Sequence, residues 1–99
     1  MSEAKVVHLV LAARWFDAIT AGTKTIEYRR VGDYWKRRLL PEPAFVVLHR
    51  GYTSTKLTRK VEMIDEGPCP YDGWHGSYYR IWLADEDASE AYRHGGKRA

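Results

Sequence analysis

Cysteine is nearly absent from this chain, and so is any long apolar segment. The one cysteine, Cys69, has no partner for an internal disulfide, so nothing in the sequence requires an oxidising compartment. No apolar run approaches the roughly 20 residues that span a membrane as a helix, and the charged N-terminal residues lack the apolar centre of a signal peptide. We therefore expect a soluble, cytoplasmic protein with no membrane partner.

Groups of metal-binding side chains are lacking too. The histidines are widely scattered and, together with Cys69, do not have the spacing of a zinc finger: they are His8, His49, His75 and His94. We expect no metal and no other cofactor.

The chain is long enough for one hydrophobic core and too short for two. It has 99 residues, of which 44% are hydrophobic and 13% aromatic, which is far from the composition of a disordered chain. Alternating and helical patterns end near residue 84, and the segment 85–99 is poor in apolar side chains. The sequence predicts a single domain over 1–84 and a flexible C-terminal tail over 85–99.

The charge is uneven along the chain. The net charge is only +3, but residues 29–60 contain nine basic side chains against Asp33 and Glu42. Such a stretch suits a phosphate-bearing partner such as RNA, although a solvated basic face with nothing bound is an equal alternative. Aromatic residues are interspersed among these basic residues or adjoin them, and they suit either a base-stacking site or packing in the core. They are Tyr28, Tyr34, Trp35 and Tyr52.

Hydrophobic periodicity predicts two short helices and five strands. The strands are expected at 6–11, 23–30, 44–50, 56–64 and 77–84, and the helices at 14–21 and 33–40. Gly22 is placed to end the first helix in a left-handed conformation, and Asp33 to cap the second. Phe16, Trp15 and Trp82 are assigned to the core. The predicted class is α+β, with a closed or nearly closed β-barrel of five to six mostly antiparallel strands.

The segment after the first helix carries the strongest motif. It reads Gly-Thr-Lys-Thr-Ile-Glu-Tyr-Arg over 22–29, and it matches Gly-x-Lys-x-x-Glu-x-Arg with Gly22, Lys24, Glu27 and Arg29. In this pattern the chain resembles the ASCH family, small domains related to the PUA fold of RNA-modifying proteins. The likeness continues through Tyr-Trp-x-x-Arg-Leu at 34–39, Gly-Tyr at 51–52 and the last strand. It implies a PUA-like barrel with a cleft lined by the motif residues.

Strand alternation constrains how these side chains meet. Thr25, Glu27 and Arg29 share one face of a strand, so Lys24 joins Glu27 and Arg29 only from a turn before the strand, or through a bulge. A lysine beside another cation and partly removed from water has a lowered pKa, so more of it is neutral and it can act as a base or activate a nucleophile. A carboxylate between two cations stays ionised and can orient water or accept from a base edge. The alternative is a structural salt-bridge network.

The resemblance also implies an activity. Some small bacterial ASCH proteins are amidohydrolases that remove the acetyl group of N4-acetylcytidine, with the motif lysine activating a threonine three residues later. That lysine is Lys24 here, but Glu27 stands in the nucleophile's place, so Glu27 would act as a general base for water. Thr25 is a further catalytic candidate. Glu62 and Glu66 are the candidates for the second glutamate of those enzymes.

Two other functions follow from the same residues. An ASCH ribonuclease is known, and metal-independent cleavage would use Glu27 or Tyr52 as base with Lys24 and Arg29 as cations. A PUA-like barrel can also bind RNA without catalysis. The partner is accordingly a modified cytidine nucleoside or RNA.

The remaining predictions concern side chains around the cleft. The substrate-binding candidates are Arg29, Tyr52, Tyr34, Trp35 and Arg50. Tyr34 and Trp35 can line a cleft or anchor their helix, and Tyr52 can stack on a base or simply pack. The Trp-His-Gly segment at 74–76 can close over a ligand. Cys69, between two prolines, is not expected to be a nucleophile.

Overall fold

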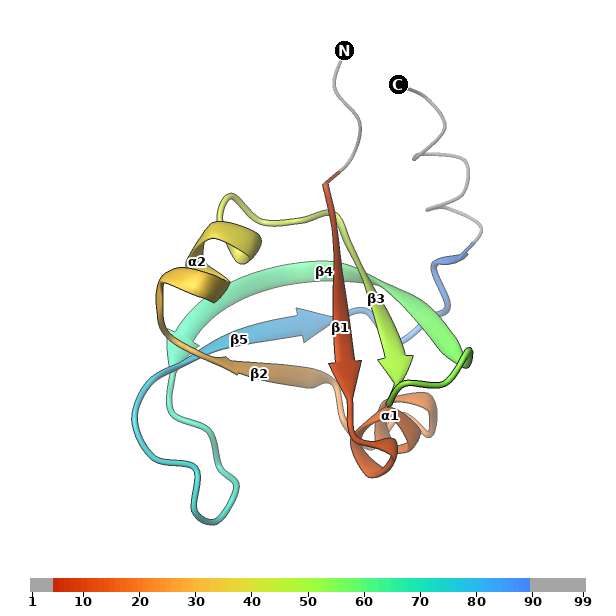
Figure 1. Cartoon of the computed structure of the whole chain (residues 1–99), viewed down its shortest axis with the longest axis horizontal. Coiled ribbons are helices and arrows are strands. Elements are labelled where there is room, and N and C mark those ends of the chain that lie inside the picture. The colour runs from red at the N-terminus through yellow and green to blue at the C-terminus, as the bar shows by residue number, and fades with distance from the viewer. Residues whose placement is uncertain (1–4, 90–99) are drawn as a thin grey trace.

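Seven elements follow one another along residues 5–89, the part of the chain that the computed structural model describes (Figure 1). They are β1 (Val6–Leu11), α1 (Ala13–Thr20), β2 (Ile26–Arg30), α2 (Asp33–Leu39), β3 (Phe45–Arg50), β4 (Lys56–Gly67) and β5 (Tyr78–Leu83). The predicted class, both helices and all five strands are confirmed, with no boundary shifted by more than three residues. Neither helix within 5–89 has the length and apolar character needed to cross a membrane.

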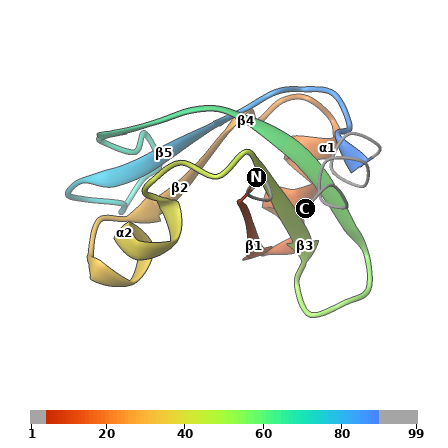
Figure 2. The same cartoon turned by 90° about the horizontal axis from the view of Figure 1, so that it is seen from above.

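The five strands form one curled sheet in the order β1-β3-β4-β5-β2. β1 and β3 are parallel and the other neighbours are antiparallel. β4 is twelve residues long and pairs first with β3 and then with β5, with a register shift between Val61 and Met63 where it crosses from one half of the sheet to the other (Figure 2).

The sheet is a half-barrel, so the expectation of a closed or nearly closed barrel is wrong for the described residues. β1 and β2 are its two edges, and no strand pairing joins them within 5–89. Closure would need the backbones of these edges to lie within hydrogen-bonding distance of each other. Instead side chains lie between them, and Arg29 of β2 donates to the carbonyl oxygen of Val10 of β1 at 3.1 Å.

The main core lies inside this curve. β1 alternates strictly, with Val7, Leu9 and Leu11 buried and the residues between them exposed. Phe16 and Ile19 of α1 pack against this inner face together with buried residues of α2, β3 and β5. Trp15 and Trp82 were expected in the core, but both are only partly buried, because Trp15 borders a surface cleft and Trp82 donates to a surface carboxylate.

The outer face of β1 and β3 carries two neighbouring imidazoles. His8 Nδ1 and His49 Nε2 lie 2.9 Å apart, and the ring centroids are 5.1 Å apart. Partial burial lowers the pKa of His49, and the neighbouring His8 and Lys56 lower it further.

The end of α1 sets the position of the motif that follows. Gly22 has φ of 83° and its N–H donates to Ile19 O at 3.1 Å, while the N–H of Thr23 donates to Ala18 O at 3.0 Å. This pair of bonds is the Schellman arrangement, which ends a helix on a left-handed residue. The prediction for Gly22 is therefore confirmed.

α2 begins without the expected side-chain cap. Gly32 occupies the N-cap position and no side chain caps the helix, so the prediction that Asp33 is the cap is wrong. Asp33 lies one residue further on, in the first turn, where its charge still favours the positive end of the helix dipole. Leu39 anchors α2, since it is fully buried in the main core.

The predicted tail is described only in part. The N–H of Ala84 donates to Lys60 O and that of Ala88 to Thr58 O, each at 2.9 Å, so residues 84–88 run along β4. Residues 90–99, the rest of the expected tail, lie outside the described residues.

An ion pair on the outer face of β4 and β5 gives a pH-dependent contribution to stability. Arg80 donates to both carboxylate oxygens of Asp65 at 2.8 and 2.7 Å, and the indole N–H of Trp82 donates to the same carboxylate at 3.1 Å. Gly67 leaves room for Arg80, because a Cβ there would lie 2.7 Å from the guanidinium carbon. The hydrogen bonds from Arg80 hold the pKa of Asp65 below its ordinary value.

We expect the stabilisation that this ion pair provides to be lost in acid. Because the folded pKa of Asp65 is lower than its unfolded one, the contribution is complete above the ordinary aspartate pKa of about 3.9 and is lost as the pH falls through the folded value. Urea unfolding between pH 6 and 3 should show a larger loss of stability for the wild type than for Asp65→Asn. Parallel pH profiles would contradict the assignment.

Candidate functional site

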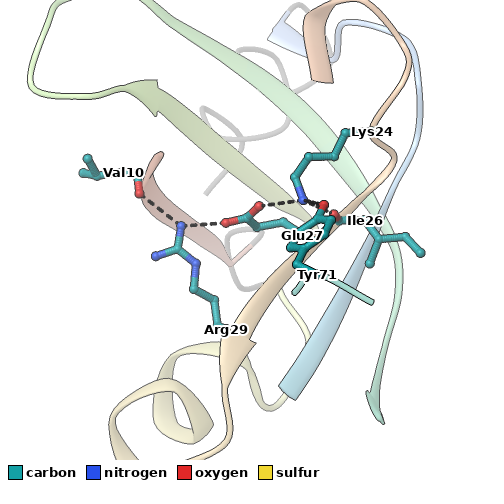
Figure 3. A network of polar contacts seen from close by, with 6 residues as sticks. All are labelled: Val10, Lys24, Ile26, Glu27, Arg29 and Tyr71. Carbon is teal, nitrogen blue, oxygen red and sulfur yellow. Dashed lines mark hydrogen bonds and ion pairs between the residues drawn. The ribbon is translucent and has the colours of Figure 1, made fainter. Parts of the chain in front are cut away.

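Lys24, Glu27 and Arg29 form one ionic cluster at the edge strand β2 (Figure 3). Lys24 Nζ lies 3.3 Å from Glu27 Oε1, and Arg29 Nη2 donates to Glu27 Oε2 at 2.9 Å. The Glu27 carboxylate is therefore fixed between two cations, one on each oxygen. This is the cation–anion–cation arrangement that the sequence left conditional on the position of Lys24.

Lys24 reaches the cluster from the turn that follows α1. The strand begins only at Ile26, so Lys24 is free of the strand's alternation, as one of the two predicted routes required. Its backbone N–H donates to Ala18 O at 3.1 Å, which extends the hydrogen bonding at the end of α1. The helix end therefore determines where the ammonium group lies.

The ammonium group of Lys24 is enclosed by aromatic rings. The residue is 8% exposed, and Nζ lies 5.3 Å from the ring centroid of Trp15 and 5.0 Å from those of Tyr28 and Tyr71. It donates to Ile26 O at 2.6 Å and to Tyr71 Oη at 2.8 Å. With Glu27 as its third polar partner, Lys24 is fully engaged with the protein and buried behind Tyr71.

Arg29 joins the cluster to the opposite edge of the sheet. The same Nη2 that bonds Glu27 also donates to Val10 O, and the guanidinium lies 4.9 Å from the ring centroid of Trp35. Its Nε is buried and has no hydrogen-bond partner within the described residues. Arg29 thus bridges the gap between β1 and β2.

A cleft of about 430 Å³ opens beside the cluster, between the two edge strands and the start of α1. Its volume lies within the range of small-molecule sites. The side chains that determine its chemistry are Trp15, Tyr28, Trp74, Glu27, Arg29 and Arg30. We use "the cleft" for this space.

The aromatic walls of the cleft come from distant parts of the chain. Trp15 stacks on Tyr71, with centroids 4.7 Å apart and ring planes 12° from parallel. Trp74 meets Tyr71 edge-on at 5.4 Å and lies 5.6 Å from Tyr78. Burial raises the pKa of Tyr28 above its ordinary value, so its hydroxyl stays neutral at physiological pH.

Lys24 does not line the cleft, although two of the rings around its ammonium group, Trp15 and Tyr28, do. Glu27 borders the cleft, whereas Lys24 borders two other spaces next to Tyr71, of about 10 and 190 Å³. The group that faces a ligand is therefore the carboxylate, and Lys24 fixes it from behind. Thr25, the other catalytic candidate, is exposed beside Lys24 and is likewise not a lining residue of the cleft.

The structure brings only some of the predicted substrate-binding residues to the cleft. Arg29 lines it, and Trp35 supports the Arg29 guanidinium. Tyr34 is 55% exposed and its ring lies against Arg38, at 3.5 Å. Arg50 forms a two-bond ion pair with Asp17, with both distances 3.0 Å.

Tyr52 and the two additional glutamates lie elsewhere. Tyr52 is 97% exposed in the loop between β3 and β4 and does not line the cleft. Glu62 and Glu66 are exposed on β4, and neither borders the cleft. No second carboxylate lines the cleft beside Glu27 in the described part of the chain.

Sequence analysis does not identify Tyr71 as part of the site, and it places Trp15 in the core instead of at the cleft. In this region the sequence predicts a ligand contact only for the segment 74–76, and Trp74 does line the cleft. The signal for Tyr71 was its place in an aromatic, proline-flanked loop, which says nothing about which side chain it meets 47 residues away.

Comparison with known proteins adds no assignment. No family model matches the chain, and no curated protein matches it either. Within residues 5–89 there is no group of three or more histidine, cysteine or acidic side chains that could hold a metal ion.

Proposed function

We propose that this chain is an ASCH-type, PUA-like domain whose cleft binds a nucleobase, either in RNA or as a free nucleoside. The observation that carries the proposal is the Glu27 carboxylate, held between Lys24 and Arg29 at the border of an aromatic cleft. Three of the four motif residues that suggested the family, Lys24, Glu27 and Arg29, are the ones that the fold gathers into this cluster.

The aromatic walls suit a flat heterocycle. Stacking of a base on an aromatic side chain contributes about 1–3 kcal/mol and tolerates any base. The polar groups of the cleft must then distinguish one base from another. The ionised Glu27 carboxylate can only accept hydrogen bonds. Glu27 therefore favours a base edge with an N–H donor, such as the exocyclic amino group of cytosine.

The positive charge around the cleft suits the phosphate backbone of RNA. Two cations, Arg29 and Arg30, and one anion, Glu27, line the cleft. Lys24 adds a third cation next to Glu27. Arg30 is exposed and is held by the Tyr78 hydroxyl at 2.9 Å and by His75 O at 3.2 Å. A phosphate attached to the bound base would meet a net positive surface.

The test is a titration of the protein with cytidine, N4-acetylcytidine and a short single-stranded RNA, followed by tryptophan fluorescence and calorimetry. Trp74→Leu should weaken binding about tenfold or more because it removes a stacking wall. Glu27→Gln should weaken it as well, because the amide offers a donor where the ligand needs an acceptor. Tyr52→Leu, at an exposed aromatic outside the cleft, should change nothing. Loss of binding in Tyr52→Leu with none in Trp74→Leu would place the ligand elsewhere and refute the proposal.

A second candidate is hydrolysis of N4-acylated cytidine, and the position of Glu27 on the cleft favours it. In this reaction Glu27 takes a proton from water as the water oxygen attacks the acyl carbonyl. The C–N bond then breaks, the proton passes to N4, and cytidine and the carboxylic acid are released. Lys24 would act by fixing Glu27, since it is enclosed by Tyr71, Tyr28 and Trp15.

Ultraviolet absorbance during incubation with N4-acetylcytidine tests this step. The wild type should turn over, and Glu27→Gln should lose activity almost completely, while Tyr52→Leu should keep it. Absence of turnover at high enzyme concentration would reject hydrolysis of this substrate and leave the binding proposal to its own titration.

A further inference from the structure

We infer that His8 and His49 form a binding site for a divalent transition metal that favours imidazole ligands, Cu(II) or Ni(II), on the outer face of the half-barrel. The site is separate from the cleft and does not depend on the proposed function. Its basis is the placement of two imidazole nitrogens on neighbouring strands.

The two side chains are brought together by the parallel pairing of β1 and β3. In the register, His8 lies opposite Val47 and His49 lies opposite Val10, so the histidines are diagonal neighbours on one face of the sheet. The same alternation buries Leu9 and Leu11 on the other face and leaves His8 exposed. Both backbones are fixed by a sheet, which makes the pair a prearranged ligand set.

The type of ligand indicates the kind of metal. His8 Nδ1 and His49 Nε2 are 2.9 Å apart, the length of a hydrogen bond, so both nitrogens can reach one ion once their rings turn. Neutral imidazole suits copper, nickel and zinc, and a given set of nitrogen ligands binds Cu(II) more tightly than Ni(II) or Zn(II).

Binding changes the tautomer of one ring and needs no further reactant. The two nitrogens share one hydrogen bond, so one carries a proton and the other accepts it. When the metal binds, that nitrogen gives its proton to water and the other nitrogen of the same ring takes one up, so both rings are neutral and each presents a lone pair. Each ring then turns to point its lone pair at the ion, with His8 on the solvent side.

The protein supplies these two ligands and water completes the coordination. No set of three or more potential metal ligands occurs within residues 5–89. Lys56 lies opposite His49 in the register of β3 and β4, and it lowers the pKa of that imidazole by its charge. An ammonium group at this position also repels a bound cation, so the affinity should be moderate, with a dissociation constant of micromolar order.

The experiment is a calorimetric titration of the full chain, without a polyhistidine tag, with Cu(II), Ni(II) and Zn(II) at neutral pH. One Cu(II) should bind per chain, and Ni(II) should bind at least as tightly as Zn(II). His8→Ala and His49→Ala should each weaken Cu(II) binding at least tenfold, while His75→Ala and His94→Ala should not. Lys56→Gln should strengthen binding a few-fold because it removes the repulsion.

A spectroscopic measurement on the wild type tests the proposal without relying on folded variants. Pulsed electron paramagnetic resonance of the Cu(II) complex should detect two coordinated imidazoles. A single imidazole, a loss of binding in His75→Ala or His94→Ala, or unchanged binding in the His8→Ala/His49→Ala double variant would overturn the assignment.

Discussion

Glu27→Leu should lower the free energy of unfolding by about 3–5 kcal/mol, because it leaves two cations without their anion in a poorly hydrated place. The Lys24 and Arg29 side chains are only 6% and 17% exposed, and the Glu27 side chain is 9% exposed. Leucine has a similar volume, so the loss reflects missing charge rather than a cavity. Urea unfolding followed by circular dichroism measures it.

A double substitution separates this effect from simple damage to packing. Lys24→Met removes one of the two cations that Glu27→Leu leaves unpaired. The double variant should therefore be more stable than the Glu27→Leu single variant. Asp17→Leu is the matched control, because Asp17 pairs with Arg50 on the exposed surface and screening by water makes that pair weak. Additive losses from Lys24→Met and Glu27→Leu would show that the two charges are not coupled.

The second large effect is expected in the core. Leu9→Ala should destabilise the fold by about 2–5 kcal/mol, because Leu9 is 0% exposed at the middle of β1 and its removal leaves a cavity between the sheet and the helices. For a domain of this size that is a large share of the total stability. Thermal and urea unfolding both measure the change.

Leu40→Ala provides the control for the same chemical change at the surface. Leu40 is 38% exposed at the end of α2, so the same truncation there should cost about 1 kcal/mol or less. Equal losses at the two positions would mean that the inner face of β1 is not part of the cooperative core.

The local elements were predictable because their signals are local. Gly22 ends α1 through its own left-handed conformation, and the alternation of β1 needs only neighbouring residues. The position of Lys24 was predictable only in part, because parity required a turn or a bulge for it to reach Glu27 and could not choose between them. The cap of α2 was not, because Gly32 and Asp33 are adjacent and one residue of shift decides between them.

The cleft was only partly predictable because its walls depend on tertiary contacts. Glu27 and Arg29 were identified from the motif, but Tyr71 meets Lys24 through a loop whose path the sequence does not specify. Tyr52 was a reasonable candidate, since it follows a strand, yet its loop leaves it in solvent. Arg50 was expected near substrate and is instead satisfied by Asp17, a partner 33 residues away.

The order of the strands has a consequence for how the chain folds during synthesis. Of the four pairings in the sheet, only β3 with β4 and β4 with β5 join strands that follow one another. β1 cannot pair until β3 has been synthesised, and β2 cannot pair until β5 has been synthesised. The N-terminal half therefore emerges from the ribosome with neither of its strands paired, and the ionic cluster of β2 has no support until the last strand is made. Such late, long-range pairing predicts slow folding for so short a chain, and a need to keep the apolar face of β1 from other chains until β3 arrives.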